Sequence, residues 1–113
     1  EEWVRQHLIW YLIYEKKYPK GLINVEKKIL VNGLTKRVDV VIFNKDGSIY
    51  LLVECKAPEI KISQETFDQI ARYNLSLNAE LLMVTNGLSH YYCVIDKEAE
   101  NYTFVESIPE YIP

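Results

Sequence analysis

Residues 37–58 read RVDVVIFNKDGSIYLLVECKAP, and this stretch decides the fold of the chain. It contains two apolar runs, Arg37–Phe43 and Ser48–Lys56, separated by a turn sequence that includes Asp46-Gly47. Asp-Gly between apolar runs is typical of a tight β-hairpin, so we predict two antiparallel strands. The first run is apolar on both faces, which indicates a central strand covered by helices. Pro58 ends the second strand, because proline has no backbone N–H to donate.

Three ionisable residues meet at one end of this predicted hairpin. Side chains alternate faces along a strand, so Glu54 and Lys56 share one face of the sheet and Cys55 points to the other. The hairpin also brings Asp39 beside Glu54. Ionised groups among apolar residues are costly unless something compensates them. Two explanations stay open: a divalent cation such as Mg²⁺ held by both carboxylates, or an ordinary ion pair between Lys56 and either acid.

The segments before the hairpin predict one helix and one strand. Residues 1–14 have apolar side chains at helical spacing, which predicts a helix with one buried face. Those apolar positions are Val4, Leu8, Tyr11 and Leu12. Residues 23–31 alternate in character, and Lys27 breaks the pattern, which favours an edge strand or a strand with a solvated end. The side chains predicted to share one face of that strand are Ile23, Val25, Ile29 and Val31.

The segments after the hairpin predict a second helix and further strands. Ser63 is a predicted N-cap for a helix over residues 64–77. Its predicted buried stripe is Phe67, Ile70, Ala71 and Leu77. Residues 80–85 form a strand connected to the hairpin through this helix, so the two strands should be parallel. With short strands at 91–95 and 102–105, the fold class is α/β, in the order α-β-β-β-α-β, with a mixed central sheet flanked by helices.

Several motifs occur in an order that resembles the PD-(D/E)xK nuclease superfamily. The first is the Asp39, Glu54-x-Lys56 arrangement across the hairpin, and the second is Gln69-x-x-x-Tyr73, which looks like a motif of the RecB-like branch. A Glu-rich helix start and a Thr-Asn-Gly turn complete the set. The resemblance is strongest to the N-terminal nuclease domain of type I restriction enzyme R subunits and their short stand-alone relatives. It covers roughly residues 1–95.

This resemblance implies a restriction-endonuclease-like fold and a metal-dependent DNA endonuclease of a restriction or DNA-processing system. The implied cofactor is Mg²⁺, with Mn²⁺ as an expected substitute. Its implied ligands are Asp39, Glu54 and the backbone carbonyl of Cys55. Lys56 would orient or help activate the attacking water and stabilise developing charge. Val38 stands where the superfamily's name has proline, a position that varies widely among relatives.

The resemblance also implies roles for residues of both helices. Glu1 or Glu2 would support a second metal ion or a metal-bound water from the first helix. Glu1 is preferred, because it continues the buried stripe of that helix whereas Glu2 does not. Gln69 and Tyr73, four positions apart on one helix face, should overlook the site and hold a nearby loop or the phosphate backbone.

Length and composition bound the remaining choices. The chain has 113 residues, enough for one domain, 1–113, whether complete or part of a longer protein. No apolar run is long enough to span a membrane and no signal peptide is evident, so we expect a cytoplasmic protein without membrane contact. Cys55 and Cys93 are predicted to be buried free thiols. His7 and His90, isolated from any third ligand, are not expected to be catalytic.

The charge distribution bears on partners. The net charge of −3 argues against a strongly basic, free-standing nucleic-acid binder. Residues 1–60 nevertheless hold 10 Lys/Arg against 8 Asp/Glu, whereas residues 61–113 hold 3 against 8. The expected partners are DNA and either a motor or translocase domain or other restriction subunits, with a homodimer as a further expectation. No Walker-type loop is present, so ATP hydrolysis of the P-loop kind would lie elsewhere.

Two other function classes stay open. The first is a nuclease-like module that binds nucleic acid without cleaving it, although the intact Asp39, Glu54 and Lys56 argue against it. The second is a structural or protein-interaction domain in which these residues form only an ion-pair cluster. Metal-binding calorimetry separates this last class from the other two.

Overall fold

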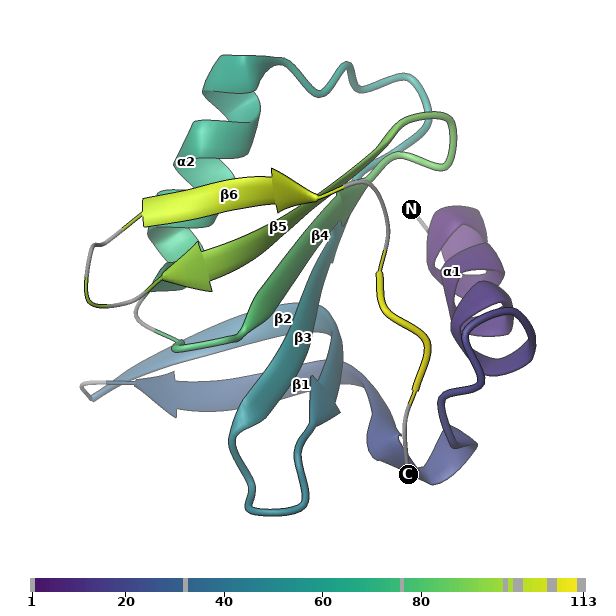
Figure 1. Ribbon diagram of the computed structural model, residues 1–113. Coiled ribbons are helices and arrows are strands. Elements are labelled where there is room, and N and C mark those ends of the chain that lie inside the picture. Colours follow the sequence, from purple (N-terminus) through teal and green to yellow (C-terminus); the bar gives the residue numbers. More distant parts are fainter. Residues whose placement is uncertain are drawn as a thin grey trace.

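In the described part of the chain, two helices cover opposite faces of one six-stranded sheet (Figure 1). The computed structural model describes residues 2–31, 33–75, 77–96, 98, 101–105 and 108–111, and for Val31, Leu34 and Tyr73 it describes the backbone alone. The helices are α1, Glu2–Tyr14, and α2, Gln64–Leu75, with a 3₁₀ turn, η1, at Lys20–Leu22. The strands are β1, Ile23–Val31; β2, Leu34–Phe43; β3, Ile49–Cys55; β4, Leu81–Thr85; β5, His90–Asp96; and β6, Asn101–Val105.

The strands lie in the sheet in the same order as in the chain. All neighbouring pairs are antiparallel except β3 and β4, which are parallel and joined through α2. A parallel pair needs such a crossover, because the chain must return to the edge where the first strand began. As a result the carboxyl ends of β3 and β4 lie side by side, with Cys55 directly paired to Thr85.

Each helix buries one face against the sheet. In α1 the buried side chains are Val4, Leu8 and Leu12, at the spacing of one helix face. They belong to an α1-side core cluster that includes Val40 and Val53 of the central strands. Val41 and Leu52 of the same strands are buried on the opposite face, which explains why the central hairpin is apolar on both faces.

The helix α2 begins where the sequence predicts and ends two residues earlier. Ser63 is its N-cap, since the Ser63 Oγ atom accepts the backbone N–H of Thr66 at 3.1 Å. Phe67 and Ala71 are buried in an α2-side core cluster on the opposite face of the sheet from α1. Leu77 also joins this cluster, from the turn that follows the helix.

One prediction about β1 is wrong. Ile23 packs against the α1-side cluster and Ile29 against the α2-side cluster, so they do not share a face. The reason is a break at Glu26, whose φ of +50° is a left-handed conformation uncommon for a residue with a side chain. The β1–β2 ladder omits the pair of Glu26 with Asp39. Such an irregularity shifts side chains to the other face beyond it.

Other expectations are confirmed. All the predicted helices and strands are present, with β2 starting at Leu34 rather than at Arg37. β1 lies at an edge of the sheet, and its Val25 is 45% exposed. Cys55 and Cys93 are buried free thiols. No described helix has the length and apolar character needed to cross a membrane.

Candidate functional site

Asp39 lies where the strands β2 and β3 separate. The β2–β3 ladder ends with Val40 paired to Val53, so Asp39 would come next, opposite Glu54. In a regular ladder a backbone carbonyl of the neighbouring strand would accept the N–H of Cys55. Here the Asp39 side chain accepts it, with its Oδ2 atom 2.8 Å from the Cys55 nitrogen. The Asp39 carboxylate is therefore fixed against the backbone between Glu54 and Lys56.

Glu54 and Lys56 lie at the carboxyl end of β3. The Lys56 Nζ atom is 3.9 Å from Glu54 Oε2, at the long end of the ion-pair range. Their side chains are 18% and 35% exposed, so the pair is only partly removed from water. Such a pair contributes little net stability. The Lys56 backbone N–H donates to the Thr85 carbonyl at 2.8 Å, which anchors this end of β3 to β4.

A polar hollow of about 480 Å³ opens beside Asp39, and we call it the Asp39 hollow. Its lining residues are Glu2, Arg5, Glu26, Arg37, Asp39 and Cys55. Three carboxylates against two guanidinium groups leave this lining with one net negative charge. A bound divalent cation would make the net charge of the lining positive, and a positive lining would attract a phosphate.

Arg5 connects α1 to the strand break at Glu26. Its guanidinium pairs with Glu2 in the first turn of α1 and with Glu26 Oε1 at 2.6 Å. These hydrogen bonds lower the pKa of both carboxyl groups and raise the pKa of Arg5. Arg37 lies farther from Glu26, at 3.4 Å, and is more exposed. Sequence reasoning missed Arg5, although its spacing from Glu2 is that of a helical ion pair.

The two glutamates predicted to assist from α1 have different outcomes. Glu1 lies outside the described residues. Glu2 is exposed and lines the Asp39 hollow, but its carboxylate is already bound by Arg5 and by Gln6 Nε2 at 3.1 Å. A role of Glu2 as a metal ligand would require it to leave Arg5, so the choice between the two glutamates stays a prediction.

The predicted pair Gln69 and Tyr73 lies on α2. The side of α2 that faces the sheet carries Phe67, Ala71 and Asn74, which are buried, whereas Gln69 is exposed. The Tyr73 side chain lies outside the part of the chain that the structure describes. The role of this pair stays a prediction.

The donor atoms around Asp39 suit a hard cation. No group of three or more His, Cys, Asp or Glu side chains is arranged for a metal among the described residues. Mg²⁺ is nevertheless commonly bound in proteins through one or two carboxylates, with waters and substrate phosphates completing its shell. The Cys55 carbonyl leaves the strand on the same edge as its N–H, toward Asp39. Binding of Mg²⁺ through Asp39, Glu54 and the Cys55 carbonyl stays a prediction.

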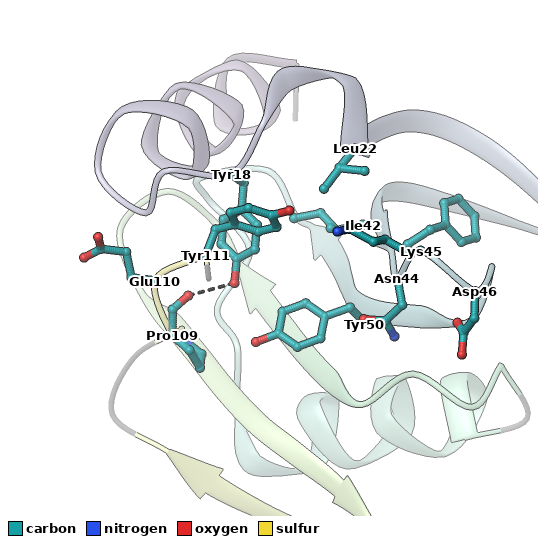
Figure 2. Close-up of a pocket in the computed structure, with 11 residues that line it drawn as sticks. Tyr18, Leu22, Ile42, Asn44, Lys45, Asp46, Tyr50, Pro109, Glu110 and Tyr111 are labelled. Carbon is teal, nitrogen blue, oxygen red and sulfur yellow. Dashed lines mark hydrogen bonds between the residues drawn. The ribbon is translucent and has the colours of Figure 1, made fainter. Parts of the chain in front are cut away.

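A second hollow, of about 580 Å³, lies at the other end of the β2–β3 hairpin (Figure 2). Tyr18, Tyr50 and Tyr111 point into this region together with polar residues of the hairpin turn. The Tyr18 hydroxyl donates to the Pro109 carbonyl at 2.7 Å, which holds the C-terminal segment against the hairpin. None of the residues predicted for the site lines this hollow, and we assign it a structural role.

Comparison with known proteins identifies a family. The profile described as type I restriction enzyme R protein N terminus matches residues 1–109. This match covers nearly the whole chain, including every residue of the candidate site. No curated protein is matched by the chain.

Proposed function

The chain belongs to the type I restriction enzyme R protein N-terminus family, and from this premise we propose that it is a metal-dependent DNA endonuclease domain. The observation that carries the proposal is the hydrogen bond from the Cys55 N–H to Asp39. It holds the Asp39 carboxylate against the strand end that also carries Glu54, the Cys55 carbonyl and Lys56. This is the donor set expected for hydrolysis of a phosphodiester.

We further infer that the fold is a restriction-endonuclease-like core of the PD-(D/E)xK superfamily. The mixed sheet supports this inference, because the hairpin β2–β3 carries the acidic residues and β4 runs parallel to β3. With one helix on each face (Figure 1), a hollow stays open beside Asp39, and the Glu54 side chain is 18% exposed. Both functional carboxylates thus come from rigid strands rather than from loops, which favours a fixed geometry.

Each residue of the site then has a defined task. Asp39 and Glu54, with the Cys55 carbonyl, hold Mg²⁺, which when bound supplies charge neutralisation and an acidified water. Lys56 directs its ammonium toward the attacked phosphate and stabilises the negative charge that develops there. The pairing of Lys56 with Glu54 at 3.9 Å is loose enough for the ammonium to turn toward the substrate.

The electrostatics of the Asp39 hollow support dependence on a cation. Without a cation its lining has a net negative charge, and the whole chain has a net charge of −3. Both disfavour a DNA phosphate. With a divalent cation the lining becomes positive, so metal and DNA should bind cooperatively. DNA and other restriction subunits or a motor domain are the proposed partners, and a cytoplasmic location is part of the same proposal.

A cleavage assay tests this function. Purified protein is incubated with supercoiled, linear and branched DNA in Mg²⁺, in Mn²⁺ and in a chelator. We expect cleavage of at least one DNA form in either metal and none with the chelator. Binding of DNA without cleavage in any metal would support a non-cleaving module instead. Failure to bind both metal and DNA would leave only a structural domain.

A further inference from the structure

A third hollow, of about 300 Å³, lies between α1 and the strands β4 and β5, and we call it the aromatic hollow. Its lining includes Trp3, His7, Trp10, His90 and Tyr92. No Asp, Glu, Lys or Arg side chain lines it among the described residues. Trp3 and Trp10 are 52% and 55% exposed, although large aromatic side chains are usually buried. Flat apolar faces are therefore open to solvent at this place.

Trp3 is held in position rather than free on the surface. Its ring lies beside that of His7, with centroids 4.4 Å apart. On the other side the indole lies over Gly87, where an added Cβ would come within 2.8 Å of Trp3 Cζ3. Gly87 has a φ of +88°, so the turn needs glycine both for its conformation and for the approach of the indole. The exposed ring is consequently preorganised.

The aromatic hollow borders the Asp39 hollow. Cys55 lines the Asp39 hollow and its ladder partner Thr85 lines the aromatic hollow. Paired residues on neighbouring strands lie about 5 Å apart. In the first turn of α1, Glu2 and Trp3 likewise face one hollow each. The two hollows are therefore neighbours, on either side of the first turn of α1 and of the paired ends of β3 and β4.

His90 adds a fixed polar group to the rim. Its Nδ1 atom lies 2.6 Å from the Thr85 Oγ1 atom, and Thr85 is buried. This contact fixes the imidazole ring and turns its Nε2 atom away from Thr85. This lining offers aromatic rings for stacking and an imidazole for hydrogen bonding at the rim. It would match a flat apolar ligand with polar edges.

We propose that the aromatic hollow binds one unstacked nucleobase of the DNA strand whose phosphate lies at Asp39, an inference that rests on the proposed function. The absence of cations in the described lining favours a neutral base over a phosphate. The adjacent Asp39 hollow provides the place for the backbone. Bases stack on exposed aromatic rings without regard to sequence, provided that they are not already paired in a duplex. The preferred substrate is therefore DNA with single-stranded or frayed nucleotides.

The two tryptophans of the chain give a direct probe, because both line the hollow. A Trp10→Phe variant leaves Trp3 as the single tryptophan. Its fluorescence is titrated with a short single-stranded oligodeoxynucleotide, and with the blunt duplex of the same sequence, in Mg²⁺. All proteins also carry Lys56→Ala, so that the DNA is not cut. We expect saturable quenching by the single strand and much weaker quenching by the duplex.

Affinity is compared by fluorescence anisotropy of a labelled single strand. Trp3→Ala should weaken binding about tenfold, the effect of removing one base-stacking ring. Trp3→Phe should restore most of that loss. The matched control is Leu30→Ala, which removes an exposed apolar side chain that does not line the hollow. It should leave the affinity unchanged, and circular dichroism verifies folding of each variant.

The outcomes separate this inference from the proposed function. Two results overturn the base site: equal affinity for the single strand with and without Trp3→Ala, or absence of quenching by the single strand. If Trp3→Ala weakens binding but the Lys56-containing protein never cleaves DNA, the base site stands and the nuclease function fails. If cleavage occurs and Trp3→Ala leaves single-strand binding intact, the function stands and the base site fails.

Discussion

Asp39 combines a negative charge with a hydrogen-bond acceptor, and the structure allows the two to be tested separately. Its Oδ2 atom accepts the Cys55 N–H within the protein, whereas the charge serves the proposed metal. Asparagine keeps an acceptor oxygen at nearly the same position but carries no charge. Alanine removes both. The pair of substitutions therefore distinguishes a structural effect from a chemical one.

Asp39→Ala should lower the free energy of unfolding by about 1–3 kcal/mol, because it leaves the Cys55 N–H without its acceptor. Asp39→Asn should cost distinctly less. Urea denaturation of both variants and of the wild type measures the difference. Equal stability of the alanine variant and the wild type would mean that water can serve the Cys55 N–H equally well.

Lys56→Ala should change the free energy of unfolding by less than about 1 kcal/mol, since its ion pair with Glu54 is long and partly exposed. Mg²⁺ binding, measured by calorimetry, should persist, while cleavage is lost. Lys61→Ala, at an exposed position, serves as the control. A destabilisation of about 2–5 kcal/mol, as for a core cavity, would make Lys56 a structural residue instead.

At the scale of elements, Arg5 fastens α1 to the strand break at Glu26. This connection positions the first turn of α1 between the Asp39 hollow and the aromatic hollow. Arg5→Ala should therefore increase hydrogen exchange of the amides at residues 6–9, which bond to the carbonyls of the first turn of α1, and leave α2 unchanged. Unchanged protection of α1 would show that Val4 and Leu8 alone hold the helix.

Acid should reproduce the effect of Arg5→Ala. The pKa of Glu2 and of Glu26 is lowered in the folded protein, chiefly by hydrogen bonds with Arg5. Groups with a depressed folded pKa contribute stability that is present above the ordinary value of 4.5 and lost as the pH falls through the folded value. Protection of the amides at residues 6–9, corrected for the intrinsic exchange rate at each pH, should thus fall below pH 4.5 in the wild type, and less in Arg5→Ala.

The elements themselves could be predicted, and the break at Glu26 could not. Apolar periodicity located each helix and strand, because the spacing of apolar residues shows which face of a helix or strand is buried. A left-handed conformation is usually signalled by glycine or asparagine, and glutamate gives no such signal. The shift of Ile29 to the other face was missed for that reason. Arg5 was missed because its partner Glu26 lies on another element.

At the scale of the whole molecule, the candidate site was predictable as far as one hairpin could specify it. Asp39, Glu54 and Lys56 follow from local strand pairing, which a turn sequence determines. The exposed position of Gln69 and the neighbourhood of the two hollows depend on how α1 and α2 rotate against the sheet. Helix rotation is set by packing of the entire core, which short motifs do not encode.

Alkaline pH should destabilise the folded protein as a whole. Burial raises the pKa of the Cys93 thiol to about 12 and that of the Tyr92 hydroxyl to about 12. The unfolded chain loses these protons nearer 9.0 and 10.0. Stability is therefore full below pH 9.0 and declines as the pH rises toward 12. Chemical denaturation across this range should show a shallower decline for Cys93→Ala, and an identical slope would contradict the assignment.

The central claim is that the charge of Asp39 serves a metal-dependent cleavage of DNA. The most direct measurement is the rate of Mg²⁺-dependent DNA cleavage by Asp39→Asn relative to the wild type, with both proteins shown to be equally folded. We predict that cleavage by Asp39→Asn falls to the level seen with chelator, although the hydrogen bond to Cys55 is kept. Cleavage at a near-normal rate by a folded Asp39→Asn protein would contradict the proposed site.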